Sequence, residues 1–314
     1  MRVFVAGATG AVGRRLVPQL VAAGHDVVAT TRSAAKLGLL QDLGAEAVAV
    51  DGLDPAGVGA AVAKAEPDVI VHEMTALAGS ADLRHFDRTF ATTNRLRTQG
   101  TDNLLAAARA TGVRRVVAQS FTGWPNERVG GPIKTEEDPL DPNPPVQQRE
   151  SLAAIRYLEQ AVLAASLDGV VLRYGTLYGP GASDEMLDVI RKRRLPIVGE
   201  ADAIWSMLHI DDAASATVAA VGRGRGLYNI VDDDPAPAGR VITELAQIVG
   251  AKPPRRVPTW LARIVAGEVP VSMLTSIRGS SNAKAKRELD WAPRWSSWRD
   301  GFRHGLSDDT PARQ

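Results

Sequence analysis

"RVFVAGATGAVGRRLVPQLVAAG" (residues 2–24) combines a short β-rich run, a glycine turn and a segment with apolar residues at helical spacing. Gly7, Gly10 and Gly13 fall between the strand and the helix. A bound pyrophosphate needs a tight turn, a backbone that it can approach closely, and free N–H groups at a helix N-terminus. Glycines at these positions meet those needs, so the stretch predicts a dinucleotide site at the start of a βαβ unit.

The same alternation of strand and helix continues to about residue 175. Further β-rich runs cover residues 26–32, 45–51, 67–73, 113–120 and 169–175. Alternation of this kind predicts an α/β fold, a Rossmann-type doubly wound parallel sheet with a smaller C-terminal substrate lobe.

The predicted domain organisation has three parts. Residues 1–175 form the NADP-binding Rossmann domain, and residues 176–306 form mainly a substrate-binding lobe that can return strands to the sheet. Residues 307–314 form a flexible tail. Residues 123–150, rich in Pro, Gly and acidic side chains, read as a long loop, a feature that is usually functional or disordered.

The composition excludes several classes of protein. The chain has 314 residues, a net charge of +1 and no cysteine, so general nucleic-acid binding, disulfides and thiolate catalysis are not expected. Its five histidines lack zinc-type spacing, and no metal is expected. Without a signal peptide or an apolar run of roughly 18 residues, we expect a cytoplasmic protein with no membrane or nucleic-acid partner.

The segment after the second strand predicts the type of dinucleotide. An NAD site usually carries an acidic residue there, whereas this chain has "TTRS" at residues 30–33. Arg32 could clamp a 2′-phosphate, so NADP(H) is predicted, with NAD(H) as second choice. A solvated surface arginine is the alternative. Asp51 would lie near the adenine or serve as a turn residue.

The predicted cofactor contacts come from the glycine turn, the ends of the second and third strands, and the carboxyl ends of the central strands. They are Gly7, Thr9, Gly10, Ala11, Val12, Gly13, Arg32, Asp51, Gly52, Leu53, Met74, Thr75, Gln119 and Tyr174.

Five segments in order resemble the extended short-chain dehydrogenase/reductase superfamily, the group of nucleotide-sugar epimerases and dehydratases. They are "GATGAVG" (7–13), "PDVIVHEMTAL" (67–77), "GTDNLLAAARATGVRRVVAQS" (100–120), "VLRYGTLYGPG" (171–181) and "MLHIDDAASA" (207–216). The resemblance implies the Rossmann fold and a nicotinamide cofactor, and it makes a homodimer possible.

The family's catalytic set is a Ser or Thr after the fifth strand and a Y-x-x-x-K motif on the next helix. Ser120 matches the first position. In "RESLAAIRYLEQAVL" (149–163), however, the tyrosine place falls on Ser151 and the lysine place on Ile155, and Tyr157 would face another way. The chain therefore resembles the atypical members that lack this motif.

Other residues could carry the chemistry. Glu73 stands where the family usually has an apolar residue, and burial could turn it into a general acid/base. A cap or a salt bridge with Arg95 or Arg97 is the alternative. The catalytic candidates are thus Ser120, Glu73 and Ser151. His72 is expected to support its loop.

The substrate contacts predicted from the C-terminal half are aromatic. Trp205 takes the place of a family arginine that contacts diphosphate, so a less charged substrate is favoured, held by Trp124, Tyr178 and Trp205. "RKRR" (191–194) is interpreted as a solvated helix end, or as a source of positive charge.

Two structural roles are predicted for the same half. Asp211 and Asp212 are expected to cap the helix that follows them. The remaining tryptophans are expected to pack inside the lobe: Trp260, Trp291, Trp295 and Trp298.

The leading hypothesis is an NADP(H)-dependent oxidoreductase acting on a small carbonyl, alcohol or unsaturated substrate. Two alternatives stay open. One is a nucleotide-sugar epimerase or dehydratase, which the missing Tyr, Lys and Arg disfavour. The other is a non-catalytic NADP(H)-binding redox sensor or regulator.

Overall fold

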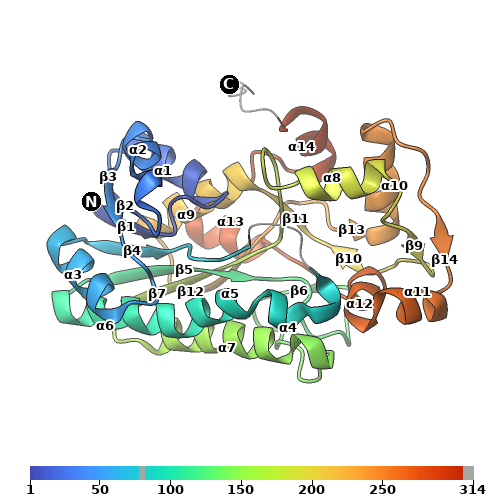
Figure 1. Ribbon diagram of the computed structural model, residues 1–314, viewed down its shortest axis with the longest axis horizontal. Helices are drawn as coiled ribbons and strands as arrows, with labels where there is room; N and C mark the ends of the chain where they lie inside the picture. The colour runs from blue at the N-terminus through green and yellow to red at the C-terminus, as the bar shows by residue number, and fades with distance from the viewer. Residues whose placement is uncertain (78–81, 307–314) are drawn as a thin grey trace.

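The computed structural model describes residues 1–77 and 82–306, so the predicted tail at 307–314 lies outside the described residues. A seven-stranded parallel sheet forms its centre, in the order β12-β7-β5-β4-β1-β2-β3 (Figure 1). The strands are β1 (Arg2–Ala6), β2 (Asp26–Thr31), β3 (Glu46–Ala49), β4 (Val69–His72), β5 (Arg115–Phe121), β7 (Asp168–Tyr174) and β12 (Gly226–Ile230).

The strand order reverses direction at β1. This strand pairs with β2 on one side, where Val3 lies opposite Val27, and with β4 on the other, where Val3 lies opposite Val69. The predicted fold class is confirmed, and a ligand site is expected outside the carboxyl ends of the strands where the order switches.

Helices cover both faces of the sheet, which is why its strands are apolar on both sides. One face carries α1 (Gly13–Ala22) and α9 (Ile210–Gly222), and the other carries α3 (Pro55–Ala65), α6 (Thr101–Thr111) and α7 (Arg149–Ala164). Between β4 and α6 the chain forms η2 (Leu83–His85), α4 (Phe86–Thr89), α5 (Ala91–Arg95) and the π-helical η3 (Leu96–Gly100).

The chain returns to the sheet after residue 176, as the predicted organisation allowed. Strand β12 pairs with β7, and α9 packs beside α1. The rest of this half forms a lobe of short strands and helices. Its elements are β8 (Thr176–Tyr178), α8 (Asp184–Arg191), β9 (Ile197–Val198), β10 (Ile204–Trp205), β11 (Met207–His209), β13 (Ala236–Pro237), α10 (Ala238–Ile248), β14 (Arg256–Val257), α11 (Thr259–Ala266), α12 (Glu268–Thr275), β15 (Gly279–Ser280), α13 (Ala283–Leu289) and α14 (Trp298–His304).

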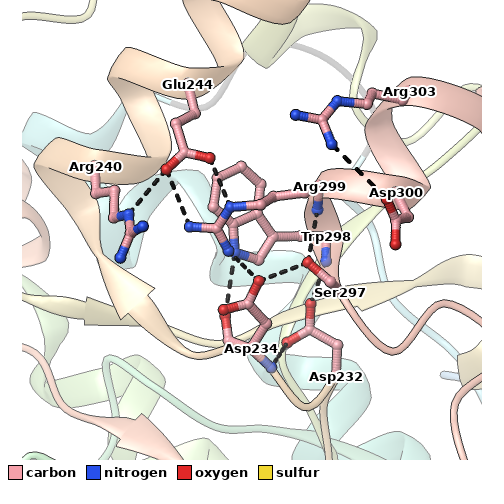
Figure 2. Close-up of polar contacts among 9 residues, drawn as sticks. All are labelled: Asp232, Asp234, Arg240, Glu244, Ser297, Trp298, Arg299, Asp300 and Arg303. Atoms are coloured by element: carbon pink, nitrogen blue, oxygen red, sulfur yellow. Dashed lines mark hydrogen bonds and ion pairs between the residues drawn. The ribbon is translucent and has the colours of Figure 1, made fainter.

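A polar cluster fastens α14 to this lobe (Figure 2). Arg299 donates from Nε to Glu244 on α10 at 2.6 Å and also pairs with Asp234. The backbone N–H of Trp298 donates to Asp232 at 2.8 Å. Burial raises the pKa of Asp232 to about 8.

The cap of α9 differs from the prediction. His209 Nδ1 accepts the backbone N–H of Asp211 at 3.1 Å, so the histidine is the N-cap. The Asp212 carboxylate instead accepts the backbone N–H groups of Arg294 and Trp295, at 2.7 and 3.0 Å. The prediction that both aspartates cap this helix is therefore wrong, because the C-terminal segment folds back onto Asp212.

Neither a membrane span nor a metal cluster is found in the described part of the chain. Within residues 1–77 and 82–306, no helix is long and apolar enough to cross a bilayer. The same residues contain no group of three or more His, Cys, Asp or Glu side chains that could hold a metal ion.

Candidate functional site

The glycine turn between β1 and α1 has the geometry of a cradle. Gly7 has φ +95°, and a Cβ on it would lie 2.6 Å from the Glu73 carbonyl carbon. A Cβ on Gly13 would lie 2.6 Å from the backbone of Ala8. Only glycine therefore lets the turn approach β4 this closely and lets α1 start beneath it. A dinucleotide pyrophosphate fits this arrangement, since the turn leads into a helix N-terminus with N–H groups to offer.

The second strand ends beside this turn. The backbone N–H of Ala8 donates to the Thr30 carbonyl at 3.2 Å, which ties the turn to β2. Thr31 Oγ1 accepts the backbone N–H of Ser33 at 3.2 Å. Arg32 and Lys36 are both exposed after this strand. The end of β2 thus presents two cations and no carboxylate.

The segment that follows β3 contains the residues predicted to lie near the adenine of the cofactor. Asp51 is exposed, and its carboxylate accepts the backbone N–H of Leu53 at 3.0 Å, which is the turn-residue role that the sequence left open. Gly52 is buried against Met74, whose sulfur would lie 2.2 Å from a Cβ at that position. Asn103 donates to the Gly52 carbonyl at 2.9 Å. These contacts bring the predicted residues of β3 and β4 together.

Glu73 lies under the glycine turn in a buried network. The Tyr174 hydroxyl donates to Glu73 Oε1 at 2.8 Å and also contacts Thr217 on α9. Glu73 Oε2 is buried and has no hydrogen-bond partner among the described residues. Burial raises the pKa of Glu73 to about 8, against the lowering effect of the Tyr174 bond, so the side chain holds a proton at neutral pH. The alternative of a salt bridge with Arg95 or Arg97 is wrong.

His72 has the supporting role that was predicted for it. Its Nδ1 accepts the backbone N–H of Met74 at 3.2 Å, and its Nε2 lies 3.2 Å from Thr101 Oγ1. Burial lowers the pKa of His72 to about 4, so the ring is neutral. A neutral imidazole can accept from the backbone at Nδ1 and donate at Nε2, and it fixes the path of the chain after β4.

Ser120 belongs to a second buried network, on the α7 side of the sheet. Its hydroxyl donates to Glu159 Oε1 at 2.7 Å. Arg173 on the neighbouring strand donates to both oxygens of the same carboxylate, at 2.7 and 2.6 Å. All three side chains are buried. From the sequence, the Ser120 hydroxyl was predicted to polarise a substrate. In the structure it donates to the Glu159 carboxylate, which connects α7 to the sheet.

Ser151 and Ile155, the residues predicted for the family's Tyr and Lys places, lie on α7, and both are fully buried. The Ser151 hydroxyl donates to Asp87 at 2.6 Å and accepts from Asn94 at 3.0 Å. The same Asp87 carboxylate accepts the backbone N–H groups of Glu150 and Ser151, at 3.0 and 2.8 Å, which caps the start of α7. The geometry thus gives Ser151 structural contacts, with Asp87 and Asn94.

Tyr157 does not replace the missing tyrosine. Its ring is 41% exposed, and its hydroxyl donates to Asp102 on α6 at 2.7 Å. The side chain therefore lies on the outer side of α7, as its position in the helix predicts. Two further predicted cofactor residues, Thr75 and Gln119, lie partly exposed near the carboxyl ends of β4 and β5.

Two of the predicted substrate residues border one aromatic cluster. Trp124 packs edge-on against Phe86 with ring centroids 5.1 Å apart, and it lies 6.5 Å from Phe121. Trp205 packs against the same cluster and donates from Nε1 to the Met273 carbonyl at 2.8 Å. Ile155 belongs to the same hydrophobic cluster, so the face of α7 that would carry the catalytic pair packs into an apolar core that contains these rings.

The third predicted substrate residue lies elsewhere. Tyr178 is fully buried, stacks on Phe302 with centroids 4.4 Å apart, and meets His209 edge-on at 5.1 Å. A Cβ on Gly301 of α14 would lie 1.9 Å from its hydroxyl. The structure therefore separates Tyr178 from Trp124 and gives it a packing role in the C-terminal lobe.

Sequence reasoning missed Glu159 and Asp87. Glu159 follows Ile155 by four residues on α7, so it lies on the same buried face, and a carboxylate there requires a buried cation such as Arg173. That spacing could have revealed the pair. Nothing local could have linked Asp87 to Ser151, because the two are 64 residues apart.

The family model described as "NAD dependent epimerase/dehydratase family" matches residues 3–230, a range that contains both networks and the glycine turn. The chain belongs to this family. Solved structures share its fold. A nucleoside-diphosphate-sugar epimerase from Pseudomonas aeruginosa superimposes with a TM-score of 0.76 at 18% identity, over 97% of this chain and 96% of that one. A UDP-glucose 4-epimerase from Thermus thermophilus, solved with NAD, gives 0.74 at 24% identity over 97% of each chain.

Two curated relatives of this chain are named reductases. A 3-diazoavenalumate denitrifying reductase from a Streptomyces species is 41% identical over 311 residues, covering 96% of this chain and 99% of the relative. A 2-alkyl-3-oxoalkanoate reductase from Stenotrophomonas maltophilia is 31% identical over 273 residues, covering 80% and 76%.

Proposed function

We propose that this protein is an NADP(H)-dependent reductase that delivers a hydride to an aromatic diazo compound and releases dinitrogen. The glycine turn would hold the cofactor pyrophosphate, and Arg32 with Lys36 would hold the 2′-phosphate. The cofactor, when bound, supplies the hydride. The chain itself would bind the cofactor and the substrate, orient them toward each other and exclude water from the site.

The observation that carries the proposal is that α7 has no tyrosine or lysine in the places predicted for the family's catalytic pair. Carbonyl reduction needs a proton donor for the developing alkoxide, and the family's Tyr and Lys provide it. Here those places hold a buried serine and a buried isoleucine, and Ser120 already donates to Glu159. A reaction that needs no proton fits this arrangement better than one that does.

Reduction of a diazonium ion by hydride needs no proton. Hydride forms a new C–H bond at the ring carbon, the C–N bond breaks, and its electron pair leaves with N₂. The cationic diazonium group is neutralised, and atoms and charge balance without a proton. The name of the relative at 41% identity, a denitrifying reductase of a diazo compound, supports this class of substrate. The aromatic side chains of Phe86, Phe121 and Trp124 favour a planar substrate.

Isotope labelling tests the proposal. The protein would be supplied with a 4-hydroxyarenediazonium salt and NADPH deuterated at C4, in H₂O, and separately with ordinary NADPH in D₂O. We expect deuterium at the former C–N carbon in the first experiment alone, together with N₂ release. Deuterium from D₂O, or no turnover above a protein-free control, would contradict the proposal.

A titration tests the choice of cofactor. Loss of a bidentate arginine contact to phosphate costs about 1.5–3 kcal/mol, which is roughly a 10- to 150-fold loss of affinity. Arg32→Ala should weaken NADPH binding by this factor and leave NADH binding unchanged, as followed by nicotinamide fluorescence. Arg114→Ala, an exposed arginine at the amino end of the sheet, is the matched control. Equal loss of both cofactors would contradict the 2′-phosphate role.

A second candidate function is reduction of a small ketone, the class in the name of the Stenotrophomonas relative. One observation favours it: Glu73 holds a proton at neutral pH, and its Oε2 is buried without a partner among the described residues, beside the glycine turn. A protonated carboxyl could then replace the missing tyrosine as the acid. Turnover of a 3-oxoacyl ester that is lost in Glu73→Gln, with no diazonium turnover, would favour this reaction.

A further inference from the structure

Helix α11 points its apolar side chains into solvent. Trp260, Leu261, Ile264 and Val265 are 65%, 38%, 72% and 60% exposed, although the helix has only eight residues. At 100° per residue the four span about 140° of the helix circumference. The buried Ala262 lies outside this arc, toward the rest of the lobe. A helix of a folded domain normally buries its apolar side, whereas α11 exposes that side to solvent.

The exposure corrects one sequence prediction. Trp291, Trp295 and Trp298 pack inside the lobe as expected, at 5%, 6% and 0% exposed, but Trp260 does not. Helix α11, which contains Trp260, lies beside α12 and β14 at the end of the molecule that is far from the Rossmann sheet (Figure 1). A contiguous apolar patch on a surface marks an interaction site.

The charges nearest to this patch in the chain are mostly positive: four of the five charged side chains in residues 252–268 are cations, and the exposed Glu268 at the start of α12 is the exception. Lys252, Arg255, Arg256 and Arg263 are all exposed, and none forms an ion pair with any residue that the structure describes. Strand β14, which contains Arg256, pairs with β9. The four exposed apolar residues and these four cations together form the α11 surface.

The "RKRR" segment extends the same surface. Residues 191–194 end α8, and Arg193 donates to the Pro253 carbonyl at 2.9 Å, which brings this segment against the chain that leads into β14. The predicted solvated helix end is thus part of a basic region that faces the same end of the lobe.

We propose that the α11 surface is a peripheral docking site for an anionic phospholipid bilayer. Apolar side chains with tryptophan suit the boundary between headgroups and acyl chains, and flanking cations suit anionic headgroups. A second copy of this chain fits less well, because a two-fold interface on this patch would bring two sets of four cations into one region, with only Glu268 of each copy nearby to offset them. The sequence alone predicted no membrane partner, because it has no apolar run of roughly 18 residues. The exposed apolar face of α11 is a tertiary feature that this criterion does not detect.

Vesicle flotation of the full chain tests the proposal without substrate or cofactor, so its outcome is independent of the reductase proposal. The protein should float with vesicles of phosphatidylcholine and phosphatidylglycerol and remain behind with phosphatidylcholine alone. About 0.5 M salt should reverse much of the binding, because it screens exposed charges. Trp260 emission should shift to shorter wavelength on the anionic vesicles, and Trp260→Phe should remove that shift.

Two pairs of variants separate the charged and apolar parts. Each cation near an anionic surface is worth about 1 kcal/mol, so Arg255→Gln with Arg256→Gln should weaken binding about thirtyfold. Ile264→Ser with Val265→Ser should weaken it and abolish the salt-resistant part. The matched control is Arg109→Gln with Arg114→Gln, two exposed arginines at the opposite end of the molecule, which should leave binding unchanged.

Three results would overturn the proposal. One is failure to bind anionic vesicles. Another is equal loss of binding in the control pair, which would make the attraction one of net charge. The third is a fall in solution mass for Ile264→Ser with Val265→Ser in light scattering, which would make the surface an interface between copies of the chain.

Discussion

The two ends of the candidate cofactor site differ in how closely they follow the family. At the glycine turn, Gly7 and Gly13 make backbone approaches that no other residue allows. At α7, the places of the proton-transferring pair hold Ser151 and Ile155, both buried. One end keeps the geometry that binds a dinucleotide, and the other uses its positions for packing.

Under the proposed reductase function, the difference separates the part of the chemistry that needs backbone geometry from the part that needs a proton donor. Phosphate binding depends on a backbone geometry that no side chain can replace, and the glycine turn between β1 and α1 keeps that geometry. A proton donor is needed only when the substrate takes up a proton. When that need disappears, α7 can be held by Glu159, Arg173 and Asp87 instead. The following variants test each side of this contrast, from the largest expected effect to the smallest.

Arg173→Met should have the largest effect on stability. It leaves the Glu159 carboxylate buried with Ser120 as a neutral donor, and breaking a buried pair in this way costs about 3–5 kcal/mol. Urea unfolding measures the loss. Glu159→Met combined with Arg173→Met should recover only part of it, because the buried Arg97, which the Glu159 charge also stabilises, then loses that carboxylate. A single-variant cost below about 1 kcal/mol would show that the pair does not hold α7.

Gly7→Ala should separate cofactor binding from folding. A Cβ at φ +95°, 2.6 Å from the Glu73 backbone, forces the turn to move, which costs about 3 kcal/mol and lowers NADPH affinity at least about hundredfold. Gly59→Ala in α3, where a Cβ meets nothing within 4 Å, should stabilise the protein slightly and bind normally. Normal NADPH binding by Gly7→Ala would contradict the cradle.

Glu73→Gln tests the buried carboxyl through pH. Because burial raises its folded pKa from 4.5 to about 8, the native state holds a proton that the unfolded state releases between these values. Stability should therefore fall as pH rises from about 5 to 8. At pH 9 the free energy of unfolding of Glu73→Gln should therefore exceed that of the wild type by on the order of 2 kcal/mol, and at pH 5 the two should be similar.

Thermal unfolding at several pH values measures this effect. Some pH dependence should remain in Glu73→Gln, because burial raises the pKa of Asp232 to about 8 as well. Identical pH profiles for wild type and Glu73→Gln would show that Glu73 is ionised in the folded protein.

Apart from the control variants, Asp87→Ala should have the smallest effect. It removes the acceptor for the backbone N–H groups of Glu150 and Ser151, and loss of such a cap costs about 1 kcal/mol. Asp102→Ala removes only the exposed bond to Tyr157 and should cost less than about 0.5 kcal/mol. Equal costs in urea unfolding would show that Asp87 does not hold the start of α7.

The sequence by itself determined the parts that depend on local pattern. The glycine spacing at residues 7–13 predicted the turn, and β-rich runs between helical segments predicted the parallel sheet. The absence of a Y-x-x-x-K motif is likewise a fact of the sequence. These features were predictable because turn geometry and the periods of helices and strands act over a few neighbouring residues.

Tertiary structure decided which side chains are buried and what they contact. Ser120 could be matched to a catalytic position, but only the fold brings Glu159 and Arg173 to it. Tyr178 could be matched to a substrate wall, but α14 returns to cover it. Trp260 was expected to pack inside, yet α11 turns it to solvent. Burial and pairing depend on segments far apart in the chain, and no local pattern encodes which of them meet.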